Sequence, residues 1–185
     1  MKNLLIVLSG PSGVGKGTIV KKLLQKESFA LSISCTTRER RESEKDGVSY
    51  FFISREKFLQ MIEEGGFLEY SNHFGNFYGT PKSFVEKQLE EHDVLLEIDV
   101  DGALNVKKVY PDALLIMVVP PDREELISRL RKRGSDDEAS IERRLLRIEY
   151  ELSKGELYDY TVVNDDLNIA VEEIEGIIKS RKNIN

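Results

Sequence analysis

Residues 10–18 form the segment of the sequence with the clearest chemical purpose. They read Gly10-Pro11-Ser12-Gly13-Val14-Gly15-Lys16-Gly17-Thr18. Glycine, four residues, glycine and lysine make up the Walker A pattern. Glycines let backbone N–H groups turn inward around an anion, and the lysine adds a full positive charge for the β- and γ-phosphates. The whole segment is therefore predicted to bind the phosphates of a nucleoside triphosphate, at the positive end of the helix that follows.

One position in this segment departs from the common pattern. Gly17 stands where Ser or Thr usually follows the lysine, and Thr18 comes one residue later. The Thr18 hydroxyl is therefore expected to approach a phosphate, or the shell of a Mg²⁺ ion, in a different way. The pattern alone fits a kinase, a GTPase or an ATPase motor. The sequence has no evident Asn-Lys-x-Asp guanine-reading motif and is short for a motor, so transfer of a phosphoryl group to a small molecule is the leading interpretation.

A second anion-binding group is predicted between residues 32 and 81. Arg38, Arg40 and Arg41 lie within four residues of one another, in a stretch without helical periodicity. Guanidinium groups bind phosphate oxygens through paired hydrogen bonds. A solvated surface loop is the simpler explanation of such a cluster. If the arginines do bind a phosphate, they would hold the acceptor opposite the donor loop.

Four short apolar runs are expected to position these residues. They are Leu4–Leu8, Val94–Ile98, Leu114–Val119 and Tyr160–Val163. Such runs are typical of strands that are buried on both faces of a parallel sheet. Helical stretches lie between or after them, at Thr18–Gln25, at Ile141–Leu152 and around Ile174–Ile178. Strands that alternate with helices predict an α/β fold with a doubly wound parallel sheet.

Two segments interrupt this alternation. Residues 32–81 contain β-like pieces at Tyr50–Ile53, Phe67–Ser71 and Phe77–Thr80 and a helix at Arg55–Glu64, which indicates an inserted lobe with a small antiparallel sheet. A polar turn within Arg131–Ser140 indicates a second insert. We predict a single domain with a core of residues 1–33, 81–128 and 150–185, a monophosphate-binding lobe of residues 34–80, and a helical lid region of residues 129–149.

Composition limits the partners and the location. The 185 residues are 40% apolar and 32% charged, with a formal net charge of −6, which suits one compact unit and argues against nucleic acid or a membrane surface as a partner. Cys35 is the only cysteine, which fits a reducing cytoplasm, and the two histidines, His73 and His92, are not clustered as zinc ligands would be. The first residues could pass for a short signal peptide, but the apolar run is brief and no small-residue cleavage site follows it, so a buried first strand is the preferred interpretation. The sequence does not indicate an oligomeric state.

Taken in order, the motifs of nearly the whole chain resemble those of guanylate kinase, and the ordered set is more specific than any single motif. The segments that carry the resemblance, besides the phosphate loop, are Ser34–Arg41, Asp46–Tyr50, Gly66–Tyr70, Phe74–Thr80, Leu96–Gly102, Arg129–Gly134 and Val163–Asp166. The resemblance implies that the acceptor phosphate is held by Arg38, Arg41, Tyr50 and Tyr78. It implies that guanine is read by Ser34, Glu69, Thr80 and Asp99.

The chemistry of guanine agrees with these implied roles. Guanine presents N1–H and N2–H₂ donors beside the O6 acceptor, so the Glu69 carboxylate can accept from both donors while a hydroxyl such as that of Ser34 or Thr80 serves O6. Adenine has a lone pair at N1 and would face Glu69 with repulsion. A polar mismatch of this kind can discriminate by roughly 10⁴. Glu69 as a strand surface charge and Asp99 as a helix N-cap remain the simpler alternatives.

The resemblance also implies a lid and an adenine site. Arg129, Arg133 and Arg144 match positions that close over the phosphates. The neighbouring Arg131, Lys132, Arg143 and Arg147 are explained as well by a solvated, salt-bridged helix surface. Asn164 and Asp165 match the segment near the adenine of ATP, and capping of the last helix is an equal alternative for them.

The expected reaction is phosphorylation of GMP, and of dGMP, by ATP. Direct in-line transfer needs positioning and charge neutralisation, so no covalent intermediate and no general base are expected. Lys16, Arg38, Arg133 and Arg144 are the predicted catalytic residues, with Mg²⁺ held by the ATP phosphates, by water and in addition by Thr18 or Asp99. The alternatives are a kinase for another monophosphate, such as AMP or dTMP, and a protein-binding module that resembles the enzyme without catalysis.

Overall fold

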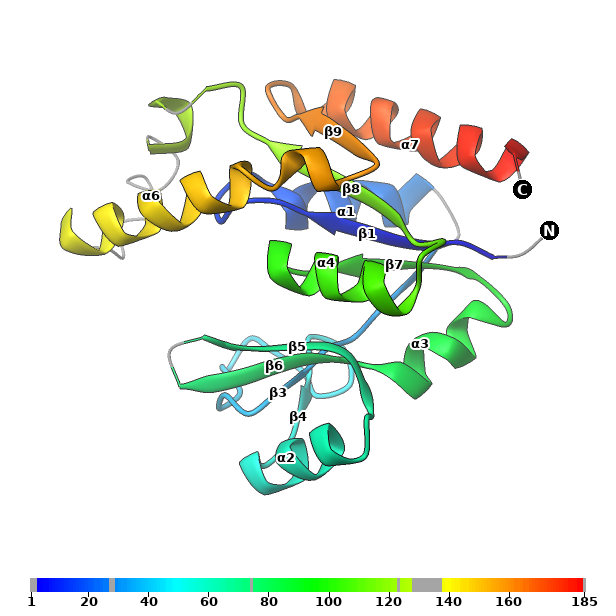
Figure 1. Ribbon diagram of the computed structural model, residues 1–185, viewed down its shortest axis with the longest axis vertical. Coiled ribbons are helices and arrows are strands. Elements are labelled where there is room, and N and C mark those ends of the chain that lie inside the picture. Colours follow the sequence, from blue (N-terminus) through cyan, green and yellow to red (C-terminus); the bar gives the residue numbers. More distant parts are fainter. Residues whose placement is uncertain (1–2, 27–28, 74, 123, 128–137, 185) are drawn as a thin grey trace.

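A computed structural model of the chain describes residues 3–26, 29–73, 75–122, 124–127 and 138–184 (Figure 1). For residues 73, 138–144 and 184 it describes the backbone alone. Within these ranges the chain forms an α/β structure with a five-stranded central sheet and a separate four-stranded sheet. None of the helices in the described part is long and apolar enough to cross a bilayer.

The central sheet is parallel throughout. Its strands are β1 (Leu5–Ser9), β2 (Phe29–Leu31), β7 (Asp93–Glu97), β8 (Leu114–Val119) and β9 (Tyr160–Val163). They lie in the order β2-β7-β1-β8-β9, so the first strand of the chain is in the centre with a crossover on each side. In open sheets of this kind, ligands bind beyond the carboxyl ends of the strands where the order reverses. The end of β1 is that point here, and the predicted phosphate loop begins there.

Helices cover both faces of the central sheet (Figure 1). Ile6 and Leu8 point to the face that is covered by α1 (Lys16–Lys26) and α7 (Leu167–Ile184). Leu5 and Val7, on alternate positions of the same strand, pack on the other face, against α3 (Lys82–Leu89) and α4 (Val100–Val109). Burial on both faces explains why the first four residues of the strand are all apolar and do not alternate with polar ones. The predicted doubly wound sheet is therefore confirmed.

The small sheet lies beyond α4, away from the central sheet (Figure 1). Its strands are β3 (Cys35–Thr36), β4 (Phe51–Phe52), β5 (Phe67–His73) and β6 (Asn76–Pro81), in the order β4-β3-β6-β5. Helix α2 (Arg55–Glu63) packs on it through the fully buried Phe58, whose ring stacks on Phe67 at 4.4 Å and on Phe77 at 5.2 Å between centroids. Three aromatic rings thus form a separate core for this sheet.

The small sheet differs from the predicted antiparallel one, because β4 pairs with β3 in parallel while β3–β6 and β5–β6 are antiparallel. The segment of residues 37–50 between β3 and β4 is long enough for a parallel crossover, which needs a dozen or more residues. That segment carries the three clustered arginines. The parallel pairing therefore turns the arginine segment into a loop that starts and ends on neighbouring strands.

The last part of the chain includes α6 (Glu138–Leu152), the short 3₁₀ turn η1 (Gly155–Leu157), β9 and α7. The polar turn predicted at Gly134–Asp137, within the insert Arg131–Ser140, lies outside the described part of the chain. The last residues of that insert, 138–140, belong to α6, where Glu and Ala favour a helix. The division into core, lobe and lid stays a prediction.

Candidate active site

The predicted phosphate loop connects β1 to α1. Gly10, Gly13 and Gly15 have positive φ angles of 141°, 91° and 99°. A Cβ atom on Gly10 would lie 2.1 Å from the carbonyl oxygen of Val118 in β8, so only glycine fits beneath the loop. The Lys16 ammonium donates to the carbonyl oxygens of Gly10, at 2.6 Å, and of Pro11, at 3.1 Å. The loop is thus a main-chain cradle at the N-terminus of α1 with a lysine at its mouth, as an anion site requires.

Asn164 supports this cradle from the other side. It is 6% exposed, and its side-chain amide donates to the carbonyl oxygen of Val14 at 2.7 Å. A Cβ on Gly15 would lie 2.6 Å from the same amide nitrogen, so Asn164 packs directly on the loop. The cap of α7 is Asp166, whose Oδ1 accepts from the backbone N–H groups of Asn168 and Ile169 at 2.7 and 3.1 Å. The capping alternative for Asn164 is therefore wrong, and Asp165 is exposed.

The predicted acceptor arginine Arg38 is held by a residue that the sequence analysis did not select. Glu44 accepts from both terminal nitrogens of Arg38, at 2.8 and 3.1 Å, and from the backbone N–H of Arg41 at 2.9 Å. These bonds, foremost the one from Arg38, lower the pKa of Glu44. The Arg38 guanidinium also lies 5.7 Å from the centroid of the Tyr50 ring. Glu44 therefore fixes the Arg38 side chain and the backbone at Arg41 in one arrangement.

The two predicted tyrosines flank Arg38. The rings of Tyr50 and Tyr78 meet edge to face, with centroids 6.0 Å apart, and Tyr78 shares a hydrogen bond with Arg38. Burial raises the pKa of Tyr50, with a further increase from Tyr78 and an opposing effect of Arg38. Tyr50 therefore keeps its proton at neutral pH. Its hydroxyl can then donate to a phosphate oxygen.

Glu69 and Thr80 form the predicted base-reading pair. Both are buried, and the Thr80 hydroxyl donates to Glu69 Oε1 at 2.5 Å. The other carboxylate oxygen lies against the first turn of α4, where a Cβ on Gly102 would be 2.8 Å from it. Asp99 caps this turn, because its Oδ1 accepts from the Gly102 N–H at 2.9 Å. The capping alternative for Asp99 is confirmed, yet Asp99 also faces the same cavity as Glu69.

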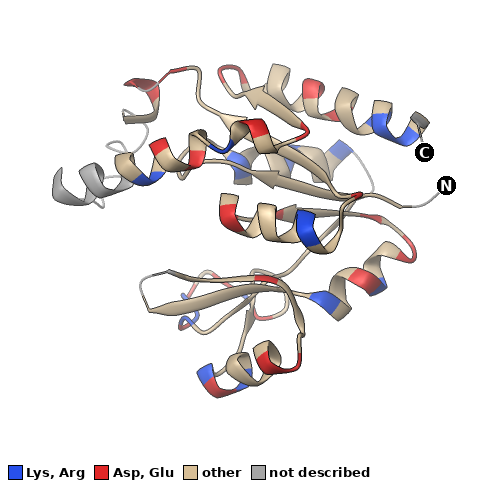
Figure 2. Cartoon of the chain, in the orientation of Figure 1, with Lys and Arg blue, Asp and Glu red and all other residues tan. Residues whose placement is uncertain are grey.

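One cleft of about 890 Å³ joins these groups from the two sheets. The predicted residues that line it are Gly10, Ser12, Lys16, Ser34, Arg38, Arg41, Tyr50, Glu69, Tyr78 and Asp99. The donor loop and the acceptor arginines therefore face a common space. Acidic and basic residues are otherwise interspersed over the described elements (Figure 2).

Several predicted residues support the cleft from behind or lie elsewhere. Thr80 contacts Glu69 and does not line the cleft itself. Six residues of the phosphate loop form its backbone or the start of α1 and do not line the cleft either, namely Pro11, Gly13, Val14, Gly15, Gly17 and Thr18. Arg129 and Arg133 lie outside the described residues, and Arg144 is described by its backbone alone.

The cleft is also lined by residues that the sequence analysis did not select, which are Ser71, Asn72, Asn76, Gly79, Glu97, Ile98, Arg147, Ile148 and Glu151. Glu97 and Ile98 could have been predicted, because they end a parallel strand next to the strand that carries the phosphate loop. Glu97 lies above the loop, since a Cβ on Gly17 would be 3.6 Å from its carboxylate. Burial raises the pKa of Glu97, and Lys16 opposes this rise.

Helix α6 contributes a charged group to the cleft. Arg147 donates through Nη2 to Asp101 Oδ2 at 2.6 Å and through Nε to Glu151 Oε1 at 2.9 Å. Tyr150 donates its hydroxyl to the other Asp101 oxygen at 2.9 Å. Glu151 is 6% exposed, and its burial raises its pKa while Arg147 and Lys16 lower it. The explanation of Arg147 as part of a salt-bridged helix surface is confirmed by these ion pairs, and Arg147 lines the cleft in addition.

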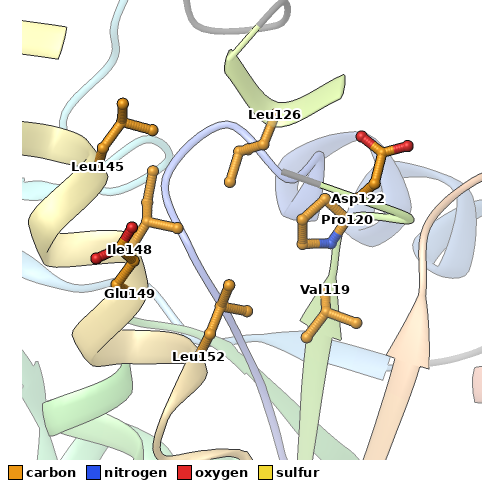
Figure 3. A pocket seen from close by; sticks show the side chains of 8 residues that line it. All are labelled: Val119, Pro120, Asp122, Leu126, Leu145, Ile148, Glu149 and Leu152. Atoms are coloured by element: carbon orange, nitrogen blue, oxygen red, sulfur yellow. The ribbon is translucent and has the colours of Figure 1, made fainter. Parts of the chain in front are cut away.

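A smaller, apolar cavity of about 320 Å³ lies beneath the same helix. Leu145, Ile148 and Leu152 of α6 face Leu126 and the end of β8 across it (Figure 3). Ile148 lines both this cavity and the cleft. The second half of α6 therefore separates the two spaces.

Comparisons with known proteins agree with the geometry. A family model described as guanylate kinase matches residues 2–181. A guanylate kinase of Clostridioides difficile (strain 630) is 51% identical over 98% of this chain and 90% of its own length. One of Prochlorococcus marinus subsp. pastoris is 47% identical over 97% of this chain and its own full length.

Solved structures give the same result. The crystal structure of guanylate kinase from Anaplasma phagocytophilum has a TM-score of 0.77 and 32% identity, over 97% of this chain and 86% of that one. A shikimate kinase from Bacteroides thetaiotaomicron, at 15% identity, has a TM-score of 0.52 over 95% of this chain and 98% of that one, and shows only the shared fold. The phosphate cradle, the arginine loop opposite it and the full-length similarity place this chain in the guanylate kinase family of enzymes.

Proposed function

We propose that the protein transfers the terminal phosphoryl group of ATP to GMP, producing ADP and GDP. The observation that carries this proposal is the single cleft lined by Lys16 of the phosphate loop and by Arg38 and Arg41 of the small sheet. Two anion-binding groups on opposite walls can hold two phosphates end to end. In-line transfer of a phosphoryl group needs that arrangement.

On the acceptor side, Arg38 and Arg41 would hold the GMP phosphate, with Tyr50 and Tyr78 as further donors. Glu69 would accept from N1–H and N2–H₂ of guanine, and Ser34 would serve O6. Asp99 lines the same wall as Glu69 and would complete the base site. These residues read the base and the phosphate, so dGMP is expected to be accepted as well.

On the donor side, the backbone of residues 10–18 would hold the ATP phosphates, with Lys16 on the β- and γ-phosphates. Asn164 would contribute to ATP binding by holding the phosphate loop in place through its hydrogen bond to Val14. Asp165 would lie near the adenine. Lys16, Arg38 and the lid arginines Arg129, Arg133 and Arg144 would neutralise the charge on the moving phosphoryl group. The GMP phosphate attacks directly, so no residue forms a covalent bond to the substrate. We expect this reaction to take place in the cytoplasm.

A Mg²⁺ ion fits this site as a companion of the ATP phosphates. Among the described residues there is no cluster of three His, Cys, Asp or Glu side chains that could hold a metal by itself. Mg²⁺ commonly keeps several waters and binds through one or two protein oxygens plus substrate phosphates. Thr18 and Asp99 are the candidate protein ligands, and Glu97 is near the loop through its contact with Gly17. The ion would supply further neutralisation of phosphate charge.

A panel of acceptors tests the proposal. The protein is incubated with ATP, Mg²⁺ and one monophosphate from the set GMP, dGMP, AMP, dTMP, CMP and UMP, and ADP release is measured. GMP and dGMP are expected to be turned over, with AMP rejected by roughly 10⁴ in kcat/KM. A faster reaction with AMP or dTMP would assign the protein to another monophosphate. Binding of ATP without turnover of any acceptor would favour a non-catalytic module.

A further inference from the structure

The charged group on α6 has contacts that a simple surface ion pair does not explain. Arg147 and Asp101 have side chains that are 42% and 40% exposed, and pairs of this kind contribute only about 0–1 kcal/mol to stability. Glu151, in contrast, is buried, and its Oε2 atom has no hydrogen-bond partner among the residues that the structure describes. A buried carboxylate in this position depends on nearby positive charge, which Arg147 and Lys16 supply.

The orientation of Arg147 leaves donors for a ligand. Glu151 binds the Nε–H and Asp101 binds one Nη2–H, while Nη1 makes no hydrogen bond within the described part of the chain. A guanidinium has five N–H donors, so three remain. The side chain lines the cleft together with Lys16, Arg38 and Arg41. A planar group fixed on one side, with donors left in the cleft that both phosphate-binding groups line, is suited to phosphate oxygens.

We propose that Arg147 contacts the phosphoryl group in transit between the two nucleotides, and that Asp101 and Glu151 are positioning residues that aim it. The inference rests on the proposed function, because the phosphates of that reaction are the ligand. Arg147 would share the negative charge that spreads over the phosphoryl oxygens, in addition to Lys16 and the lid arginines. Asp101 joins α4 to α6, so the aim of Arg147 depends on both elements.

Kinetics with ATP and GMP test the contact. Arg147→Ala is expected to lower kcat about 10- to 100-fold and to change either KM less than threefold, because the lost interaction forms in the transition state. Arg147→Lys should recover part of kcat, since it restores the charge without the planar fork. Leu146→Ala is the matched control, because the neighbouring Leu146 is 69% exposed and does not line the cleft, and it should retain the wild-type kcat.

A double-mutant cycle tests the positioning role. Asp101→Asn keeps the shape of the side chain but removes its charge, and is expected to lower kcat several-fold in the wild type and not further in Arg147→Ala. Additive losses would show that Asp101 acts without Arg147 and would overturn that part of the proposal. The whole proposal fails if Arg147→Ala keeps the wild-type kcat, whether or not its melting temperature falls, or if it changes KM alone. A wild-type protein that does not phosphorylate GMP would instead overturn the proposed function.

Discussion

Two glutamates of the small sheet region, Glu44 and Glu69, carry the same functional group, but their surroundings suit Glu69 to ligand binding and Glu44 to the orientation of an arginine. Glu69 is buried beside α4, and the Thr80 hydroxyl occupies one of its oxygens. Glu44 lies in the loop and is occupied by Arg38 and the backbone of Arg41. A carboxylate that lines a cavity can accept from a donor of a ligand. A carboxylate filled by arginine can only orient that arginine.

Removal of the Glu69 carboxylate should therefore affect GMP rather than ATP. Glu69→Ala leaves the guanine N1–H and N2–H₂ groups without an acceptor, which costs about 1.5–3 kcal/mol for a charged hydrogen bond. We expect kcat/KM for GMP to fall roughly 10- to 150-fold and the affinity for ATP, measured by calorimetry, to stay near the wild-type value. Glu63→Ala, an exposed glutamate of α2, is the control. Equal loss for both nucleotides would contradict the assignment.

Replacement of Glu44 should act through Arg38. Glu44→Gln keeps the size of the side chain but weakens its hold on Arg38, and we expect KM for GMP to rise about tenfold, with kcat less affected, in steady-state kinetics. The bond from Arg38 lowers the pKa of Glu44 below its ordinary 4.5, so the pair stabilises the folded state above that pH. The stability difference between wild type and variant, measured by urea unfolding, should shrink as pH falls below 4.5. A difference that stays constant to pH 3 would contradict this.

Some residues of the cleft can be predicted from local sequence motifs, whereas others are placed there only by contacts between distant parts of the chain. Lys16 was predictable because glycines and a lysine at fixed spacing have few other uses, and Arg38 because neighbouring motifs support it. Arg147 was not, because a basic residue among the acids of a helix is usually a surface charge. Its place depends on Asp101, 46 residues earlier in the chain. A contact of that range is set by the packing of α6 against α4, which local sequence does not describe.

At the level of elements, strands that are mostly apolar over four to six residues could be predicted, and the shortest ones could not. The four predicted core strands correspond to β1, β7, β8 and β9. Strand β2 is apolar throughout, but it has only three residues, all half-buried, at the edge of the sheet, so its run is too short to indicate a strand. Helix α3 was not located because it has eight residues and buries only Val85, and α4 was indicated only by Asp99 as a possible N-cap. The parallel pairing of β3 with β4 was missed because two-residue strands carry no pattern.

Helix α7 contains a glycine that can be replaced with benefit. Gly176 is exposed and has a helical backbone conformation that any residue can adopt. A Cβ atom there would meet nothing within 4 Å. Gly176→Ala should stabilise the protein by about 0.5–1 kcal/mol, because alanine loses less backbone entropy in a helix. Thermal unfolding should show a rise of about 1–4 °C.

Gly79 provides the opposite case for comparison. A Cβ there would lie 2.9 Å from the Phe67 ring and 3.1 Å from the Glu69 carbonyl oxygen. Gly79→Ala should therefore lower the melting temperature. If Gly176→Ala lowered it too, the helix around Gly176 would not have the open surroundings described here.

At the scale of the molecule, the proposed reaction draws its two anion-binding groups from two different sheets. The phosphate loop belongs to the central sheet and the predicted acceptor arginines to the small sheet, and both line one cleft of about 890 Å³. Helix α6 lies along this cleft with an apolar cavity on its other side. A helix with space behind it can shift as the cleft closes, so the catalytic arrangement depends on how the elements move together.

Closure gives a prediction for the whole protein. With both GMP and a non-hydrolysable ATP analogue bound, the phosphates link the two sheets and water should be excluded from the cleft. Small-angle X-ray scattering should then give a smaller radius of gyration than for the free protein. Each nucleotide alone should have a smaller effect, because it contacts mainly one wall. An unchanged radius with both ligands would contradict closure.

The close approach of Gly10 to the carbonyl of Val118 also has a consequence for inheritance. Any missense change in a glycine codon adds at least one carbon atom, and at this position that carbon would lie 2.1 Å from an oxygen of a buried strand. No codon other than those for glycine is therefore expected to survive there in a saturation library selected for activity. Natural variation is tolerated more readily on the surface of this protein. At Gly10, the first residue of the phosphate loop, every missense change is expected to be removed by selection.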